Sequence, residues 1–249
     1  MMADLRLIPL GVGDAFSARW YSSCLLLEAG GTRLLIDCPH PIRKILREAG
    51  ELAHEPLDLD RVSGVILTHL HADHASGLEG YAYYNHFYLR RKAVVLTHPE
   101  VAKDLWDGHS RAGMGVQFSL DGKCANKACD DYFDIHPLST AAAVTFGPFA
   151  IECRPTHHPI YTTALRIRAS GRALGYSADT SFDESLIAWL AAADTMIHET
   201  NYGIHTPYAK LAALPEDVRQ RMHLIHYPDD FDLSSSAIPP LSVGRVYRV

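Results

Sequence analysis

The sequence has few cysteines, no excess of positive charge and no long apolar run, and each shortage excludes a class of protein. Its five cysteines are odd in number and scattered, which argues against a disulfide framework and favours a reducing compartment, the cytoplasm. The net charge of −6 provides no basic surface for a long nucleic acid or for a membrane. No apolar stretch approaches the ~20 residues of a membrane span, and the first residues lack the order of a secretory signal.

Apolar side chains are plentiful: they make up 47% of the 249 residues, against 21% that are charged. This balance is typical of a globular protein with a substantial buried core. No repeat, low-complexity tract or linker divides the chain, so we expect one domain over residues 1–249. We interpret the aromatic-rich and then polar stretch from about 81 to 137 as an insertion over the functional site.

Short apolar runs and amphipathic segments predict strands and helices in both halves of the chain. The expected strands are Leu5–Leu10, Cys24–Glu28, Arg33–Ile36, Val62–Leu67, Ala93–Thr97, Phe149–Arg154, Ala164–Ile167, Ala173–Tyr176, Thr195–His198, Met222–Ile225 and Arg245–Val249. The expected helices are Ile42–Ala49, Glu100–Trp106, Phe182–Ala192 and Pro215–Arg221. Strands come first and helices then interleave with them, which favours two packed sheets with helices outside.

A dense group of metal-ligand side chains directly follows the apolar run Val62–Leu67. His69, His71, Asp73 and His74 place three imidazoles and one carboxylate within six residues at the end of a buried strand. From such a loop His69 and His71 can meet one cation while Asp73 and His74 meet a second. Imidazole and carboxylate ligands suit zinc, and also manganese or iron. A polar loop that is rich in histidine by chance is the weaker interpretation.

Three later strands also end in residues of the metal-ligand type. His157 and His158 follow one strand, Asp179 follows another, and His226 ends a third. Each has an ordinary alternative, since a lone histidine is often a satisfied polar group and Asp179 could cap the helix after it. The recurrence of one pattern at four strand ends favours a metal site that gathers all of them.

With this histidine-rich loop and these later residues, the chain resembles the metallo-β-lactamase fold superfamily of hydrolases. The resemblance runs from the turn Leu10–Asp14 to His226 and implies an α/β (α+β) fold, a four-layer αββα sandwich with a metal cleft at the edge between its sheets. It implies two divalent metal ions. The implied ligands are His69, His71 and His158 for the first ion, Asp73, His74 and His226 for the second, and Asp179 as the bridge.

The third histidine of the first ion has two candidates. His158 is preferred to His157 because its spacing to Arg166 resembles that of the ribonuclease Z branch, but both remain open. Two divalent ions about 3.5–4 Å apart would activate a shared water as the nucleophile. Asp73 or Asp179 could orient that water, and we expect Thr68 and Ser177 to help fix the ligand imidazoles.

The segment His198–Pro207 resembles the ribonuclease Z-like phosphodiesterases, which carry a His-Glu-Ala-Thr segment and later a His-Ser/Thr. This chain has Glu199-Thr200 in place of Glu-Ala-Thr, and His205-Thr206 follows. By this resemblance His205 donates a proton to the leaving alkoxide and Glu199 keeps it protonated, because a nearby carboxylate raises the pKa of an imidazole. The alternative is that Glu199 and His205 only hydrogen-bond a loop together.

These features favour a phosphodiesterase acting on a small phosphodiester, such as a cyclic nucleotide or another nucleotide. Ribonuclease Z carries a long arm between the third ligand and the bridging aspartate, whereas only a short strand pair lies between His158 and Asp179 here. A negative net charge also disfavours a long polyanionic substrate.

The aromatic side chains of the expected insertion have two interpretations. Tyr84, Phe87, Tyr88 and Trp106 could stack on a base. Packing in the core or at a homodimer interface is the more common role, and the resemblance implies a homodimer because relatives in this branch often pair. Cys124 and Cys129 in the same stretch are interpreted as free thiols rather than as half of a zinc clip or an adventitious disulfide.

Two other functions remain compatible with the same ligands. A lactonase, thioesterase or β-lactamase of this fold would use the ions but would need no proton donor at His205. A sensor module without chemistry would usually have lost at least one ligand, and all seven are present. A flavodiiron-type redox role is weaker, since such sites favour glutamate where this chain has His71.

Overall fold

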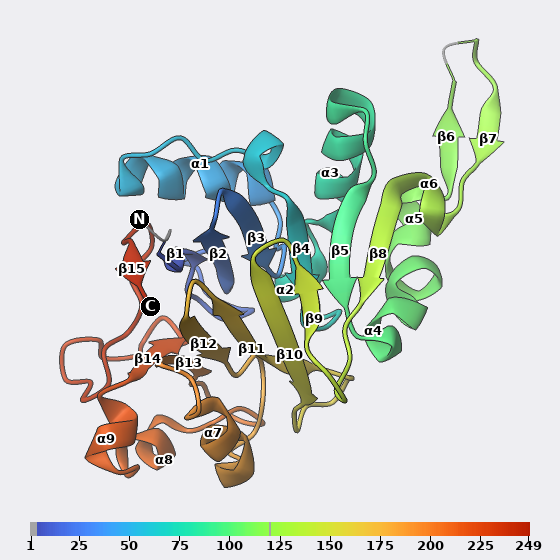
Figure 1. Cartoon of the computed structure of the whole chain (residues 1–249). Coiled ribbons are helices and arrows are strands. Elements are labelled where there is room, and N and C mark those ends of the chain that lie inside the picture. The colour runs from blue at the N-terminus through green and yellow to red at the C-terminus, as the bar shows by residue number, and fades with distance from the viewer. Residues whose placement is uncertain (1–3, 120) are drawn as a thin grey trace.

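The computed structural model describes residues 4–119 and 121–249; residues 1–3, at the start of the predicted domain, and Leu120, in the predicted insertion, lie outside that description. Two mixed β-sheets pack face to face, and helices cover the outer side of each (Figure 1). This is the four-layer αββα sandwich that the sequence predicts.

The first sheet has seven strands, antiparallel at one side and parallel at the other. Its spatial order is β15 (Tyr247–Arg248), β1 (Arg6–Gly11), β2 (Cys24–Ala29), β3 (Thr32–Ile36), β4 (Gly64–Leu67), β5 (Ala93–Thr97) and β8 (Phe133–Pro137). From β3 onward the neighbours are parallel. Its helical elements are α1 (Ile42–Ala53), η1 (Leu59–Arg61), α2 (Ala72–Ala75), α3 (Leu78–Tyr83), η2 (Tyr84–Leu89), α4 (Pro99–Asp104), η3 (Leu105–Ser110), α5 (Arg111–Met114) and α6 (Cys129–Tyr132).

The second sheet has six strands and lies against the opposite face of the inter-sheet core. Its order is β14 (Met222–Ile225), β13 (Thr195–Glu199), β12 (Arg172–Tyr176), β11 (Thr163–Ala169), β10 (Phe149–Pro155) and β9 (Val144–Phe146). Strands β12, β13 and β14 are parallel and the others pair antiparallel. Its outer helices are α7 (Glu184–Leu190), α8 (Tyr208–Ala212) and α9 (Glu216–Arg219).

The central strands of the first sheet bury side chains on both faces. On β3, Leu34 and Ile36 belong to the core between the sheets, whereas Leu35 belongs to the core under α1 and α3. Successive side chains of a strand point to opposite faces, so a strand covered on both sides needs an unbroken apolar run. Each such leucine contributes about 1.5–3 kcal/mol when fully buried.

Helix α1 begins where the sequence pattern predicts it but is longer than predicted. Its buried residues Ile42, Ile45, Leu46 and Ala49 repeat at helical spacing and cover the first sheet. The prediction ended the helix before Gly50, but the helix continues for four more residues. A Cβ at Gly50 would lie 2.7 Å from the carbonyl oxygen of Glu55. This glycine therefore allows the returning chain to pass close by, and it does not end the helix.

The segment of about 81 to 137, which we interpreted as an insertion, is in part an integral piece of the fold. It contains β5 and β8, two strands of the first sheet. Between them, the hairpin of β6 (Val116–Phe118) and β7 (Cys124–Asn126) extends away from the body of the molecule (Figure 1). The five cysteines are free thiols, which include Cys124 and Cys129 as the sequence predicts.

The aromatic side chains of this segment pack against other side chains of the fold. Tyr84 stacks on Tyr88 with ring centroids 4.9 Å apart, and Trp106 stacks on Tyr132 at 6.2 Å. The guanidinium of Arg43 on α1 lies 4.8 Å from the ring centre of Tyr84. These contacts favour the packing interpretation of these aromatics over base stacking.

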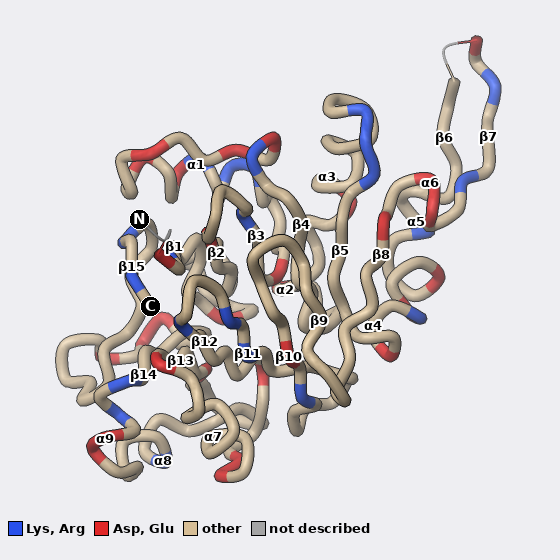
Figure 2. The backbone as a smooth tube through the Cα atoms, in the orientation of Figure 1, with Lys and Arg blue, Asp and Glu red and all other residues tan. Residues whose placement is uncertain are grey.

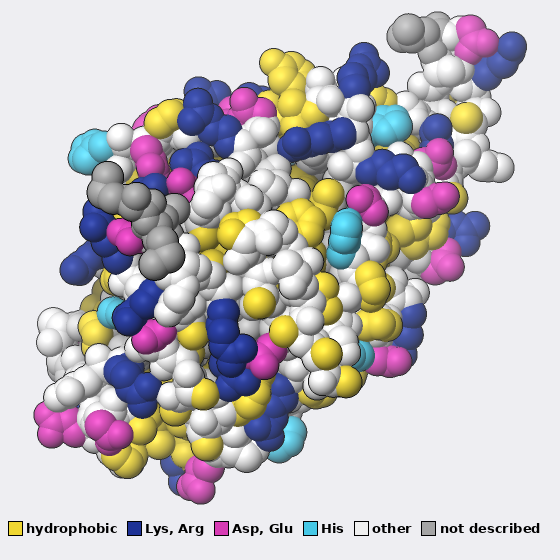
Figure 3. Space-filling view, in the orientation of Figure 1, with side chains coloured by type: hydrophobic (Ala, Val, Ile, Leu, Met, Phe, Trp, Pro, Cys, Tyr) yellow, Lys and Arg dark blue, Asp and Glu magenta, His cyan; other side chains and the backbone are white. Residues whose placement is uncertain are grey.

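Charged residues of both signs are interspersed along the backbone (Figure 2) and over the face of the molecule in Figure 3. Many pair with one another, as Arg166 does with Glu152 at 2.7 Å. Within the part of the chain that the structure describes, no helix combines the length and the apolar character needed to cross a membrane.

Candidate metal centre

Six strands deliver side chains to one edge of the two sheets. In the first sheet β3 and β4 are parallel neighbours, and in the second β12, β13 and β14 are parallel. Strand β10 runs in the same direction as β12, because each pairs antiparallel with β11. The carboxyl ends of these strands therefore meet within each sheet, and the residues that follow them face one cleft.

The backbone turns sharply at three of these strand ends. Asp37 after β3, Ala178 after β12 and His226 after β14 have φ angles of 62°, 49° and 60°. Residues other than glycine adopt this left-handed conformation rarely. It persists where the surrounding structure holds it, which is often at functional sites. Here three such residues lie around a single cleft.

The structure brings His69, His71, His158 and Asp179 into one group whose candidate ligand atoms all lie within 4.8 Å of one another. His158 Nε2 lies 2.9 Å from His71 Nδ1. The Oδ2 atom of Asp179 lies 3.8 Å from His69 Nε2 and 3.9 Å from His158 Nε2. The ring of His158, and not that of His157, enters this group.

A second group shares Asp179 and adds Asp73, His74 and His226, again within 4.8 Å. His74 Nε2 lies 3.2 Å from Asp73 Oδ2 and 3.2 Å from Asp179 Oδ1. His226 Nε2 lies 3.2 Å from Asp73 Oδ2 and 3.6 Å from Asp179 Oδ2. All seven residues that the sequence singles out as ligands therefore converge, and Asp179 is common to both groups.

The chemistry of these atoms fits divalent cations. His69 Nε2, His74 Nε2 and Asp179 Oδ1 are buried and have no hydrogen-bond partner among residues 4–119 and 121–249. Buried polar atoms without a partner are costly, and one cation in each group would together satisfy all three. Burial, followed by the charge of His74, lowers the pKa of His69, and burial lowers the pKa of His158 to about 4. Both imidazoles are therefore held neutral, the form that binds a metal.

The carboxylate of Asp179 is ionised in this environment. Burial alone would raise its pKa, but the neighbouring imidazoles of His226 and His74 lower it well below the ordinary value. The alternative role as a helix cap does not apply. Asp183, not Asp179, caps α7 by accepting hydrogen bonds from the backbone N–H groups of Ser185 and Leu186.

Asp37 supports two ligand imidazoles, and sequence reasoning missed it. Its fully buried carboxylate lies 2.8 Å from His74 Nδ1 and accepts hydrogen bonds from the backbone and hydroxyl of Thr68. The Thr68 hydroxyl gives its single proton to Asp37 and so accepts one from His69 Nδ1, 2.9 Å away. This arrangement directs the Nε2 lone pairs of both His69 and His74 into the site. The signal available in the sequence was an aspartate directly after the apolar strand Leu34–Ile36.

Thr68 thus acts on an imidazole as the sequence predicts, whereas Ser177 acts elsewhere. The hydroxyl of Ser177 accepts a hydrogen bond from the backbone N–H of Glu199 at 2.9 Å and donates one to the carbonyl of Ala178. The prediction that Ser177 helps to fix an imidazole was therefore wrong. It fixes the end of β13, whose last residue is Glu199.

Glu199 and His205 lie beside the second group. The carboxylate of Glu199 is buried, accepts the backbone N–H of Thr180 at 2.7 Å and lies 2.9 Å from His205 Nδ1. Burial alone would lower the pKa of His205, but its hydrogen bond to the Glu199 carboxylate outweighs burial and raises the pKa. Because Nδ1 faces Glu199, Nε2 is the ring atom left for another partner.

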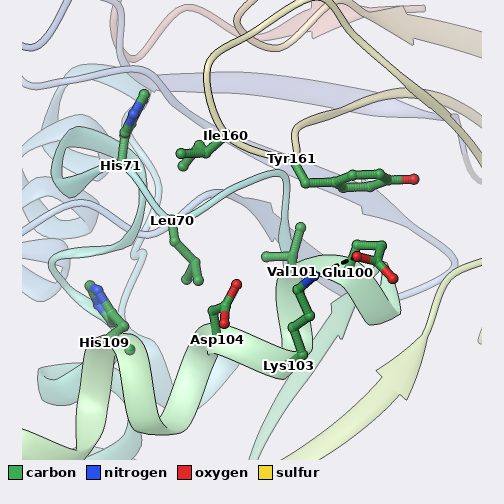
Figure 4. Close-up of a pocket in the computed structure, with 10 residues that line it drawn as sticks. Leu70, His71, Glu100, Val101, Lys103, Asp104, His109, Ile160 and Tyr161 are labelled. Atoms are coloured by element: carbon green, nitrogen blue, oxygen red, sulfur yellow. Dashed lines mark hydrogen bonds and ion pairs between the residues drawn. The ribbon is translucent and has the colours of Figure 1, made fainter.

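A cavity of about 730 Å³ opens above the two groups. Its lining combines ligand residues such as Asp73 and Asp179 with His205 and with an apolar rim. A second cavity of about 440 Å³ adjoins it, since His71 lines both. Leu70, Val101 and Ile160 line the second cavity with apolar side chains, and Glu100, Lys103 and Asp104 add charged ones (Figure 4).

The sequence matches, over residues 5–238, the family described as Anti-Pycsar protein Apyc1. One curated relative of that description, from Bacillus phage BSP38, is 30% identical, and the alignment covers 99% of each chain.

Solved structures agree on the fold. The metallo-β-lactamase fold protein YhfI from Bacillus subtilis superposes with a TM-score of 0.77 at 18% identity, covering 99% of this chain and 100% of that one. The short form of human tRNase Z superposes with a TM-score of 0.67 at 16% identity, covering 97% of this chain and 98% of that one. PqqB from Methylobacterium extorquens, described as Zn(2+)-bound, superposes with a TM-score of 0.65 at 14% identity. The match covers 98% of this chain and 100% of that one.

Proposed function

We infer the function of this chain from the family to which it belongs, that of the anti-Pycsar protein Apyc1, and from the geometry of the candidate metal centre. We propose that it is a metal-dependent phosphodiesterase that hydrolyses small phosphodiesters, with nucleoside cyclic phosphates as the substrate class. The cavity of about 730 Å³ lies in the range of small-molecule sites and has room for one nucleotide.

In this proposal the seven converging residues hold two divalent ions. His69, His71 and His158 would bind the first, Asp73, His74 and His226 the second, and Asp179 both. Zinc suits this mixture of imidazole and carboxylate, and manganese or iron would also fit. When bound, the ions would lower the pKa of a shared water and neutralise charge on the phosphodiester.

In this proposal, side chains of the protein orient the attacking water and protonate the leaving group. The Asp73 carboxylate lines the cavity and is placed to accept a hydrogen bond from the attacking water. His205, whose Nδ1 is anchored by Glu199, would deliver the proton on Nε2 to the departing alkoxide oxygen. An alkoxide is a poor leaving group, so proton transfer from a positioned acid speeds its departure by about 10²–10⁴-fold.

The contact between Glu199 and His205 is the observation that carries this proposal. Its 2.9 Å separation joins a buried carboxylate to an imidazole that lines the same cavity as Asp179. If these residues only tied a loop together, the pair would have no need to face the candidate ligands. Hydrolysis of a lactam or thioester by the same ions needs no acid at this position, so this pair favours the phosphodiesterase over those alternatives.

A panel of substrates tests the proposed function. Purified protein supplied with Zn²⁺ or Mn²⁺ is expected to release nitrophenol from bis-nitrophenyl phosphate and to open nucleoside 3′,5′-cyclic phosphates. Its kcat/KM for a β-lactam, a lactone or a thioester should be lower by at least about 100-fold, because discrimination of this size follows from specific transition-state contacts. Preferential turnover of a lactone or thioester would overturn the proposal.

A further inference from the structure

Three large apolar side chains stand exposed on the rim of the metal cavity. Phe16 is 93% exposed, Tyr202 65% and Ile204 55%, and all three line the cavity that contains Asp179 and His205. Single exposed apolar residues are common on protein surfaces, whereas a group of them beside a concave site indicates binding. We refer to Phe16, Tyr202 and Ile204 as the apolar lip.

The loops that carry the apolar lip are held in place by polar contacts beneath it. The buried carboxylate of Asp14 accepts the backbone N–H of Phe16 and the side-chain amide of Asn201, each at 2.9 Å. Asn201 in turn accepts the backbone N–H of Tyr202 at 2.7 Å, and the Tyr202 hydroxyl donates to Asp230 at 3.2 Å. These bonds join two loops that are 187 residues apart in sequence. The apolar lip is therefore exposed but anchored.

We propose that the apolar lip binds the base of the nucleotide whose phosphate lies at the metal centre. This inference rests on the proposed function, since it assigns the rest of the same substrate. A nucleotide joins a phosphate to a flat aromatic base, and the cavity joins candidate cation ligands to an aromatic and aliphatic surface. Stacking of a base on an aromatic side chain strengthens binding by roughly 5- to 140-fold.

The neighbouring cavity of Figure 4 is less suited to the base. Its polar side carries the carboxylates of Glu100 and Asp104, which repel a phosphate-bearing ligand. The ammonium of Lys103 is already paired with Glu100 at 2.6 Å. The ring of Tyr161 stacks on His98 with centroids 4.7 Å apart, so one of its faces is occupied. This cavity therefore supplies a control site next to the same metal ligands.

The test compares two substrates across three single variants. The substrates are a nucleoside 3′,5′-cyclic phosphate and the 3′,5′-cyclic phosphate of a ribose without a base. Phe16→Ala and Ile204→Ala remove parts of the apolar lip, and Ile160→Ala removes a similar volume from the neighbouring cavity. The high exposure of Phe16 and Ile204 means that their truncation should not disturb folding.

We expect Phe16→Ala to raise KM for the nucleotide by roughly 5- to 140-fold and Ile204→Ala, which removes an aliphatic contact, to raise it by a smaller factor, with little change in kcat in either variant. KM for the substrate without a base should stay the same, and Ile160→Ala should leave both values unchanged. Equal effects on the two substrates, no effect at all, or a selective effect of Ile160→Ala would each overturn the inference. So would a changed oligomeric state of the lip variants, because the lip would then be an interface between copies of the chain.

A binding measurement separates this inference from the proposed function. Calorimetry would measure the affinity of the metal-loaded protein for a nucleoside 5′-monophosphate. If no phosphodiester is hydrolysed, the proposed function fails. Weaker nucleotide binding by Phe16→Ala than by Ile160→Ala would still support the apolar lip as the base site. Equal binding by these variants would overturn the inference even where hydrolysis is intact.

Discussion

Replacement of Asp179 by asparagine is expected to lower kcat/KM for phosphodiesters by more than about 100-fold, the upper end of what the loss of an outer-shell partner of a metal ligand costs. Asp179 is the one residue shared by both groups of candidate ligands among the described residues, and its oxygens lie 3.2 to 3.9 Å from four imidazoles. An amide has one acceptor oxygen and no negative charge. It therefore cannot serve two cations at once, and steady-state kinetics with added Zn²⁺ should show the loss.

Asp183→Asn is the matched control for this prediction. Asp183 lies four residues away and caps α7, with its carboxylate bonded to the backbone of Ser185 and Leu186. Asparagine is also a good cap, so this variant should keep near-normal activity and a similar thermal midpoint. If Asp179→Asn were as active as Asp183→Asn, the bridging role of Asp179 would be wrong.

Replacement of His205 by alanine is expected to affect substrates according to their leaving groups. For a nucleoside cyclic phosphate, whose leaving group is an alkoxide, kcat should fall by about 10²–10⁴-fold because the proton donor is lost. For bis-nitrophenyl phosphate the loss should be much smaller, since nitrophenolate departs without a proton. The measurement is kcat for both substrates in the wild type and the variant.

Two further variants sharpen the test of His205. Glu199→Gln keeps a side chain that can accept a hydrogen bond from His205 Nδ1 but removes the charge, so its loss with the alkoxide substrate should be smaller than that of His205→Ala. His157→Ala, one residue before the candidate ligand His158, should leave both substrates unaffected. An equal loss on both substrates with His205→Ala would mean that His205 shapes the site and does not donate a proton.

The central strands of the first sheet were predictable because they are buried on both faces. Runs such as Leu34–Ile36 and Val62–Leu67 signal strands covered on two sides, and the structure contains β3 and β4 at those places. The same reasoning located the candidate ligands, since His69 and Asp179 lie within three residues of the ends of β4 and β12. Parallel strands gather their carboxyl ends at one edge, so residues far apart in sequence were expected to meet there.

Other features depend on contacts that a local pattern does not encode. The role of Asp37 arises because β3 and β4 are neighbours, which places its carboxylate against Thr68 and His74. Ser177 contacts Glu199 because β12 pairs with β13. The segment of about 81 to 137 resembled an insertion because its two sheet strands are separated by short helical turns and by a projecting hairpin. In each case strand pairing determined the outcome, and pairing is a property of the whole chain.

The central claim is that seven side chains assemble a site for two cations, and elemental analysis of the purified protein tests it most directly. The account predicts close to two transition-metal ions per chain, with fewer bound to Asp179→Asn and the same number bound to Asp183→Asn. A wild-type protein that binds no stoichiometric transition metal, even after incubation with Zn²⁺, Mn²⁺ or Fe²⁺ and removal of the excess, would contradict the account.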